Sequence, residues 1–276
     1  HSTSSGASVT VPKPRDYGDF DGDGLLDFIT TSGGLNGNNG AVFFGGGSVP
    51  SLLTGFTSSL GARTTVAYMP STAGDNNNNR VPFISQLVDS ISVDNGRGQT
   101  RTTRFSYTNQ KYDYDNRKSL GFGSVTAHLP AIEGESEGPQ VVTVYLNDHF
   151  AQKGRIKSQT RIQGGVTYTQ VINDWSAVDP SRNGPHRSYL TGTRTRLRHG
   201  TELIETARTY SWSDYGARTR TTDLGFTSGG TDLDASDTVS TIRFFTPNAA
   251  KYIVRQPYEQ RVVQGLNNTS NRALWL

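Results

Sequence analysis

The amino-acid sequence predicts an all-β protein in which short antiparallel strands are joined by many turns. Hydrophobic residues make up only 33% of the 276 residues, and the chain contains 31 Gly and 11 Pro, a composition that suits frequent turns. Runs rich in Thr, Val, Ile and aromatic residues recur at regular spacing, as strands require. Residues that favour helices rarely recur at helical spacing, so we expect little helix.

The first strands are expected on either side of a glycine-rich spacer near the start of the chain. Residues 28–31 (FITT) and 41–44 (AVFF) are β-prone runs, which is typical of two strands joined by a loop. Three glycines and a proline over residues 45–50 then interrupt the chain, and they indicate a boundary near residue 50. The domains that we expect cover residues 1–50, 51–170 and 171–276.

The middle of the chain contains a hairpin signal. The triplet Asp94-Asn95-Gly96 lies between an apolar stretch over residues 81–93 and an alternating run over residues 100–107 (TRTTRFSY). Alternation places every second residue on the same face, so these runs are expected to be paired strands.

A longer antiparallel sheet is expected to follow. The acidic loop over residues 131–139 separates two apolar runs, 123–129 and 141–146, and is interpreted as the end of a hairpin. After it, strands rich in Thr and Arg repeat at regular spacing, which favours a continuing sheet. The other expected strands cover residues 63–68, 155–162, 166–172, 191–199, 202–212, 217–222 and 238–245.

The composition excludes several classes of site. Cysteine is absent, so disulfides, thiolate zinc sites and a cysteine nucleophile are excluded. The net charge of +3 is too small by itself to demand an anionic partner. No run approaches the roughly 18 apolar residues of a membrane helix, and no signal region begins the chain. We therefore expect a soluble fragment, with the opening residues 1–9 (HSTSSGASV) as a cut point or tag remnant.

The strongest motif is an aspartate-rich loop over residues 19–27 (DFDGDGLLD). Its carboxylates occupy relative positions 1, 3, 5 and 9, with glycines between them. Such spacing lets the backbone curl around a hard cation, which binds the carboxylates and a backbone carbonyl, and without a cation the carboxylates would repel one another. Ca²⁺ is the predicted cofactor. The predicted ligands are Asp19, Asp21, Asp23, Leu25 and Asp27.

The same loop has two other interpretations, an EF-hand and a metal-free acidic turn. An EF-hand is disfavoured because position 12 is Thr30 instead of a bidentate Glu, and because the flanking residues are typical of strands. A solvated acidic turn without metal stays open as the alternative.

The loop and its flanks resemble a known repeat. Residues 18–33 (GDFDGDGLLDFITTSG), followed by residues 41–47 (AVFFGGG), resemble an FG-GAP (VCBS) repeat, the calcium-loop blade of integrin-type β-propellers. Only one such repeat is present in the sequence, and one blade cannot close a propeller. The resemblance therefore implies a terminal blade that precedes another region.

The residues after this blade resemble the middle region of the B component of insecticidal toxin complexes and of SpvB-like proteins. Several landmarks occur in order, which is more specific than any one of them. The landmarks are Leu60-Gly61-Ala62, Asp94-Asn95-Gly96, Tyr112-Asp113, Arg117 and Gly121-Phe122-Gly123.

The last third of the chain resembles Rhs proteins. Residues 207–225 (ARTYSWSDYGARTRTTDLG) are similar to a YD repeat, although Asp214-Tyr215 reverses the usual order, and residues 231–265 are similar to Rhs strand and turn sequences. The resemblance implies an FG-GAP blade over residues 1–50, a toxin-complex B middle-like region over 51–170, and an antiparallel β-sheet shell of Rhs/YD-repeat type over 171–276.

This family resemblance implies a function. In such proteins the shell encloses a toxic C-terminal polypeptide. The chain would then be a non-enzymatic structural segment of a large secreted bacterial protein involved in virulence. Its partners would be the C-terminal toxin polypeptide or other toxin-complex subunits, with no nucleic acid and no membrane span.

No catalytic constellation is recognised in the sequence, so we expect no enzyme. The nearest approach to a nucleophile elbow, residues 121–125 (GFGSV), lacks the closing glycine. Three glutamates over residues 133–137 share one loop in which nothing separates their pKa values. No H-E-x-x-H motif is present, and each histidine is interpreted as structural or exposed. The histidines are His1, His128, His149, His186 and His199.

Two alternatives concern binding. Arg194, Arg196 and Arg198 project from one face of a strand, where they could contact phosphate or form the wet polar face of a sheet. The chain could also be an extracellular calcium-stiffened adhesion or ligand-binding module. That function predicts glycan or receptor binding by this fragment alone, whereas a scaffold predicts none.

Overall fold

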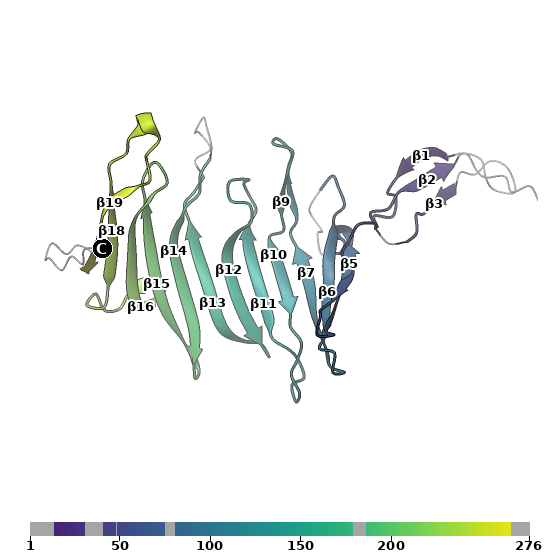
Figure 1. Cartoon of the computed structure of the whole chain (residues 1–276), viewed down its shortest axis with the longest axis horizontal. Coiled ribbons are helices and arrows are strands. Elements are labelled where there is room, and N and C mark those ends of the chain that lie inside the picture. Colours follow the sequence, from purple (N-terminus) through teal and green to yellow (C-terminus); the bar gives the residue numbers. More distant parts are fainter. Residues whose placement is uncertain (1–13, 31–40, 48, 75–80, 179–185, 266–276) are drawn as a thin grey trace, which may run out of the picture. The chain divides into compact units, whose positions relative to one another are not determined.

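The protein, as a computed structural model, divides into two compact units. One comprises His1–Asp75 with Pro82–Thr100, and the other comprises Asn76–Val81 with Arg101–Leu276. Strands dominate both units (Figure 1). The structure describes residues 14–30, 41–47, 49–74, 81–178 and 186–265.

The described residues contain little helix, as expected. Two short 3-10 turns, Ser71–Ala73 and Ala249–Lys251, are the helical elements of this part of the chain. The all-β prediction is therefore confirmed at the level of nearly all-β antiparallel sheets.

A small antiparallel sheet holds the acidic loop of the first unit. Its strands are β1 (Pro14–Gly18), β2 (Asp27–Thr30) and β3 (Ala41–Phe43), in the order β1-β2-β3. Phe28 stacks on Phe43, directly opposite it, with ring centroids 4.8 Å apart. The two strands expected around the spacer are confirmed. The FG-GAP blade stays a prediction, because a propeller blade has four strands and the described residues provide three.

The first unit also contains β4 (Gly55–Thr57), β5 (Arg63–Pro70) and β6 (Gln86–Asp94), which pair antiparallel in this order. The predicted turn follows β6. Gly96 has a φ of 72°, its N–H donates to Asp94 Oδ1 at 2.8 Å, and Asn95 N–H donates to the Gln99 carbonyl at 3.0 Å. Glycine adopts this left-handed conformation without steric cost, which explains the turn.

The second unit is a long antiparallel sheet. Its strands follow the order β7-β10-β11-β12-β13-β14-β15-β16-β18-β19, so almost every strand lies beside its neighbour in the sequence (Figure 1). This confirms the prediction of a continuing antiparallel sheet. The bounds are β7 Thr100–Thr108, β10 Ser124–His128, β11 Gln140–Leu146, β12 Arg155–Gln163, β13 Val166–Trp175, β14 Leu190–His199, β15 Glu202–Trp212, β16 Arg218–Ser228, β18 Val239–Phe245 and β19 Pro257–Gln264.

Three short strands lie off this path. β8 (Lys111–Asp113) and β9 (Lys118–Gly121) form a separate two-stranded sheet, and β17 (Thr231–Asp232) pairs with β16. The predicted hairpin end over residues 131–139 is confirmed, because β10 and β11 pair antiparallel on either side of it. The assignment of the long sheet to an Rhs/YD-repeat shell, and the domain boundaries at 50 and 170, stay predictions.

The sheet has very little apolar core. Among the described residues, the buried hydrophobic side chains are Leu120, Ala207, Ala217 and Leu224, and buried polar or charged residues outnumber them. Domains usually bury an apolar face between two packed layers. Here backbone hydrogen bonds and cross-strand pairs must supply most of the stability.

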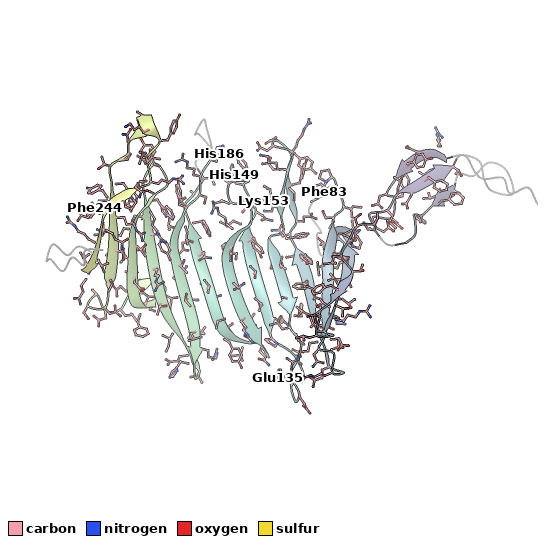
Figure 2. All side chains as sticks on the ribbon, viewed as in Figure 1. Phe83, Glu135, His149, Lys153, His186 and Phe244 are labelled. Atoms are coloured by element: carbon pink, nitrogen blue, oxygen red, sulfur yellow. The ribbon has the colours of Figure 1, made fainter. Side chains whose placement is uncertain are left out.

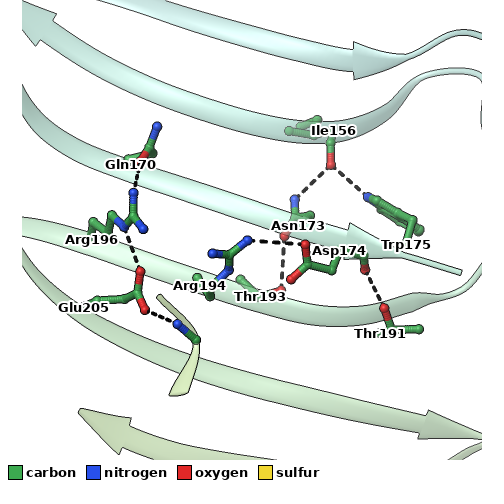
Figure 3. A network of polar contacts seen from close by, with 11 residues as sticks. Ile156, Gln170, Asn173, Asp174, Trp175, Thr191, Thr193, Arg194, Arg196 and Glu205 are labelled. Carbon is green, nitrogen blue, oxygen red and sulfur yellow. Dashed lines mark hydrogen bonds and ion pairs between the residues drawn. The ribbon is translucent and has the colours of Figure 1, made fainter. Parts of the chain in front are cut away.

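A row of polar side chains crosses four neighbouring strands, and Figure 3 shows three of its members, Gln170, Arg196 and Glu205. Gln170, Arg196, Glu205 and Thr227 lie directly opposite one another on β13 to β16. Arg196 donates to Glu205 Oε2 at 2.7 Å and to Gln170 Oε1 at 3.1 Å, and Thr227 donates to Glu205 Oε1 at 2.8 Å. We call these four residues the polar ladder.

The charge of Glu205 is stabilised at its buried position. Burial of its carboxyl raises the pKa, but hydrogen bonds from Arg196, Gly230 and Thr227 together outweigh burial and lower the pKa below its ordinary value. The other two arginines of this strand also have partners. Arg194 lies 3.4 Å from Asp174 Oδ1, and Arg198 Nε donates to the Thr167 carbonyl at 2.7 Å. Cross-strand pairing therefore accounts for the predicted arginine face.

Replacing Arg196 should destabilise the sheet. Arg196→Ala leaves the Glu205 charge buried without its cation, and we expect the free energy of unfolding to fall by about 3 kcal/mol in urea denaturation at pH 7. Because the folded-state pKa of Glu205 is lowered, its contribution is present above its ordinary pKa and is lost as the pH falls through the folded value. The control Arg161→Ala, at an exposed site on β12, should change stability by less than about 0.5 kcal/mol. Equal losses in both variants would contradict this account.

A buried pair of hydroxyl groups should also make a measurable contribution to the free energy of unfolding. Ser240 Oγ lies 3.2 Å from Thr222 Oγ1 and 3.1 Å from the Gly265 carbonyl, and both hydroxyl-bearing residues are buried. Ser240→Ala removes a partner from the buried Thr222 hydroxyl and from the half-buried Gly265 carbonyl, so unfolding should become easier by about 1–3 kcal/mol. Ser106→Ala, at an exposed position of β7, is the matched control, and a neutral Ser240→Ala variant would show that the pair contributes nothing.

Candidate metal centre

The acidic loop connects β1 to β2, so the hydrogen-bonded strand ends hold both of its ends. Gly18 and Asp27 are register partners across the two strands. Between them Gly22 and Gly24 adopt φ values of 81° and 87°, which L-residues with a side chain rarely adopt. The glycines between the aspartates therefore let the chain turn back on itself within a few residues.

The loop brings three of the four predicted carboxylates together. One oxygen from each of Asp19, Asp21 and Asp27 lies within 4.8 Å of the others. Asp27 is fully buried, Asp19 is half-buried and Asp21 is exposed. The cluster therefore has a buried base and an open side.

Backbone N–H groups orient the two less exposed carboxylates. Asp19 accepts from Gly22 N–H at 2.7 Å through Oδ1 and from Gly24 N–H at 2.8 Å through Oδ2. Asp27 accepts from Phe20 N–H and from Gly45 N–H, each at 2.6 Å. The bonds from Gly45 and Phe20 lower the pKa of Asp27, so its carboxyl is held in the charged form.

Asp23, the fourth predicted carboxylate ligand, forms local contacts. Its Oδ1 accepts from Leu25 N–H at 2.7 Å and closes a local turn, and Asp23 is not part of the group of three. Its carbonyl accepts from Gln86 Nε2 at 2.9 Å. Metal binding by Asp23 and by the Leu25 carbonyl stays a prediction.

The donor chemistry of the cluster fits a hard divalent cation. Partial desolvation and the neighbouring charges of Asp23, Asp27 and Asp19 raise the pKa of Asp21, with one opposing hydrogen bond from the Asp23 backbone. A bound cation would reverse this repulsion, because it attracts all of the carboxylates. All side-chain donors are oxygens, which is the set that Ca²⁺ prefers.

Residues distant in the sequence support the loop. Besides Gln86 on β6, Thr72 Oγ1 donates to the Gly22 carbonyl, and a Cβ at Gly24 would lie 2.6 Å from Gln86 Nε2. The sequence contains no local signal for these contacts, because 50 residues or more separate the partners. They restrict the loop to one arrangement within the first unit.

His149, His186 and Glu135, which lie outside this cluster, contact neighbouring protein groups (Figure 2). The rings of His149 and His186 lie 4.9 Å apart, and His149 Nδ1 accepts from Ala151 N–H at 3.0 Å. Glu135 lies in an exposed loop, where it accepts from Gln163 Nε2 at 2.7 Å. His1 lies outside the described residues.

Solved structures similar to this chain belong to toxin complexes. A crystal structure of TcdB2-TccC3-TEV has a TM-score of 0.67 and 13% identity over 89% of this chain. A Tc holotoxin pore structure from Photorhabdus luminescens has a TM-score of 0.64 and 12% identity over 91% of this chain. This chain covers only 16% and 17% of those chains, respectively. At these identities the likeness shows the fold alone.

Another solved toxin-complex structure is also similar to this chain. A crystal structure of TcdB2-TccC3 has a TM-score of 0.62 and 13% identity, covering 88% of this chain and 17% of the other. No curated protein matches the sequence. Within the described residues, the helices are too short and too polar to cross a membrane.

A family model accounts for more than half of the sequence. The model described as the insecticide toxin TcdB middle/N-terminal region matches residues 4–154. These residues include the acidic loop and the strands from β1 to β11. The chain therefore belongs to the insecticide toxin TcdB middle/N-terminal region family.

Proposed function

We propose that this chain is a non-enzymatic wall segment of a large secreted toxin-complex protein that encloses a toxic polypeptide. The observation that carries the proposal is the long antiparallel sheet of the second unit, which has few buried apolar side chains. Such a sheet suits a wall better than a compact domain, because a compact domain buries one of its faces in an apolar core. Family membership and the fold shared with toxin-complex structures support the same function.

The polar ladder is consistent with a wall that faces an enclosed chain. Large apolar patches capture other polypeptides, whereas a surface of paired charges and hydroxyl groups offers little apolar area. Gln170, Arg196 and Glu205 already bind one another, so their charges are compensated within the sheet. An enclosed polypeptide could then move along such a face without being captured.

The proposed partners are other toxin-complex subunits or a C-terminal toxin polypeptide. The similar structures are of TcdB2 together with TccC3. The sequence of this chain lacks recognised catalytic motifs, which supports a structural function. We also propose that the terminal sheet belongs to an FG-GAP blade and that the last third of the chain belongs to an Rhs/YD-repeat shell.

We further propose that the acidic loop binds Ca²⁺ and that the ion is structural. Asp19, Asp21 and Asp27 would hold it, with Asp23 and the Leu25 carbonyl as the other predicted ligands. Buried Asp27 accepts a hydrogen bond from Gly45, which lies two residues after the end of β3, so an ion at Asp27 would connect the loop to the three-stranded sheet. The role of the ion would be to stabilise the turn between β1 and β2.

Calorimetry tests the metal assignment. We expect Ca²⁺ titrated into the metal-free chain to give a saturable heat that EGTA reverses. Asp21→Ala combined with Asp23→Ala should abolish that heat, because it removes two of the predicted oxygen ligands. The control, Glu133→Ala combined with Glu137→Ala, removes the same charge from an exposed loop and should bind normally. Unchanged binding in the double aspartate variant would refute the site.

Protease protection tests the wall function. The full-length protein that contains this chain is produced together with its toxin polypeptide and digested with a nonspecific protease. We expect the toxin polypeptide to survive in the complex and to be degraded when it is produced alone. Equal degradation in both samples would contradict enclosure.

A glycan and host-protein screen with the 276-residue chain distinguishes the adhesion alternative. The wall function predicts no specific binding by this chain alone, whereas an adhesion module predicts a measurable affinity. Specific binding that is lost on calcium removal would favour the adhesion module.

A further inference from the structure

A pocket at one end of the long sheet combines arginine and aromatic side chains. Adjacent antiparallel strands alternate in direction, so the start of β12 and the end of β13 lie at the same end of the sheet as the end of β15 and the start of β16. These strand ends contribute Arg155, Trp175, Trp212 and Arg218 to a pocket of about 410 Å³. This volume lies in the lower part of the range of small-ligand sites.

The lining of the pocket contains arginines but no acidic residue. Arg155, Arg187, Arg218 and Arg255 line it, and no Asp or Glu does. None of these arginines forms an ion pair with a carboxylate in the part of the chain that the structure describes. Among the described residues, the pocket therefore concentrates cationic charge without an internal counter-ion.

Most N–H groups of these arginines have no described acceptor. Three of the four each donate to a backbone carbonyl, and these bonds orient the guanidinium groups while leaving other N–H groups available. The side chain of Arg218 forms no hydrogen bond with the described residues, and its guanidinium lies over the Tyr210 ring. The carbonyl contacts are Arg155 Nε to Ala151 at 3.1 Å, Arg187 Nη1 to Asp214 at 2.6 Å and Arg255 Nε to Tyr215 at 2.9 Å.

Aromatic rings form another part of the pocket lining. Tyr189 stacks on Trp212 with centroids 5.0 Å apart and an interplanar angle of 19°. The Arg155 guanidinium lies 4.6 Å from the centroid of the Trp175 ring. Both indole N–H groups are satisfied, because Trp175 donates to the Ile156 carbonyl at 3.0 Å and Trp212 donates to the Leu190 carbonyl at 2.6 Å. The rings are therefore held in place before any ligand binds.

Other arginines of this sheet pair with carboxylates. Arg196 binds Glu205 and Arg208 binds Asp223, each at 2.7 Å. Arg218 lies on the same strand as Asp223 but beside Tyr210, 5.5 Å from its ring centroid, with no carboxylate. The pocket offers the same guanidinium chemistry with the carboxylate missing.

We propose that this pocket binds a polypeptide segment that places a carboxylate beside an aromatic side chain. The planar guanidinium groups match the two oxygens of a carboxylate, and the aromatic wall is more extensive than a simple inorganic anion can use. Recognition of acidic motifs by arginine clusters is a recurring mode of peptide binding. The pocket has room for about two side chains, so a Glu-Phe or Asp-Tyr pair is the unit that it recognises.

Tryptophan fluorescence tests this proposal directly, since two of the three tryptophans of the chain line the pocket. The probes are N-acetyl-Glu-Phe-amide and the matched N-acetyl-Gln-Phe-amide, titrated into the 276-residue chain. We expect a saturable change with the Glu peptide and binding that is roughly tenfold weaker or more with the Gln peptide, because the charge-assisted hydrogen bonds are lost.

Variants locate the binding. Arg155→Gln combined with Arg218→Gln should weaken binding of the Glu peptide by roughly tenfold or more, while the melting temperature shows that the variant is folded. Arg161→Gln removes an exposed arginine from the same strand as Arg155 and should bind like the wild type.

Three results would overturn the proposal. The first is no saturable response to the Glu peptide up to about 10 mM. The second is equal affinity for the Glu and Gln peptides, together with tighter binding of inorganic phosphate or AMP, which would identify a general oxyanion or nucleotide site. The third is unchanged binding in the folded Arg155 and Arg218 double variant.

Discussion

The antiparallel hydrogen-bond ladder of the long sheet is the interaction on which the rest of the second unit depends. The four buried hydrophobic side chains of the described residues are too few to form an apolar core that could hold the strands together. Each strand instead bonds its two neighbours, and buried polar pairs such as Thr222 with Ser240 reinforce the ladder locally. Stability therefore comes from strand-to-strand contacts, and large apolar residues such as Leu197 and Phe226 remain exposed on this chain.

Both candidate sites lie where strands begin or end. The aspartate loop lies between two paired strands, and the register of Gly18 with Asp27 closes it. The arginine and aromatic pocket forms where β12, β13, β15 and β16 begin or end at one end of the sheet. The long sheet thus provides binding groups at its strand ends, while compensated polar pairs and exposed apolar residues such as Leu197 and Phe226 lie along its strands.

Much of the fold could be predicted from the sequence, because alternation and turn residues act locally. The turn at Gly96 and the strands around it follow from neighbouring residues, whereas β1, β4, β8, β9, β17 and β19 were missed. All of these except β19 are five residues or shorter, and β19 spans eight residues. The grouping of Asp19, Asp21 and Asp27 was predicted from spacing alone. Their partners Gly45 and Gln86, and the pocket that joins residues 155 to 255, depend on long-range register, which no local pattern reveals.

Electron cryomicroscopy of the full-length protein tests the central claim, which is that this sheet is a wall and not half of a compact domain. The account predicts that further strands continue the sheet beyond β19 and that the face with the polar ladder borders an enclosed space. A map in which a second layer of the same protein packs on that face and buries it in an apolar core would contradict the account.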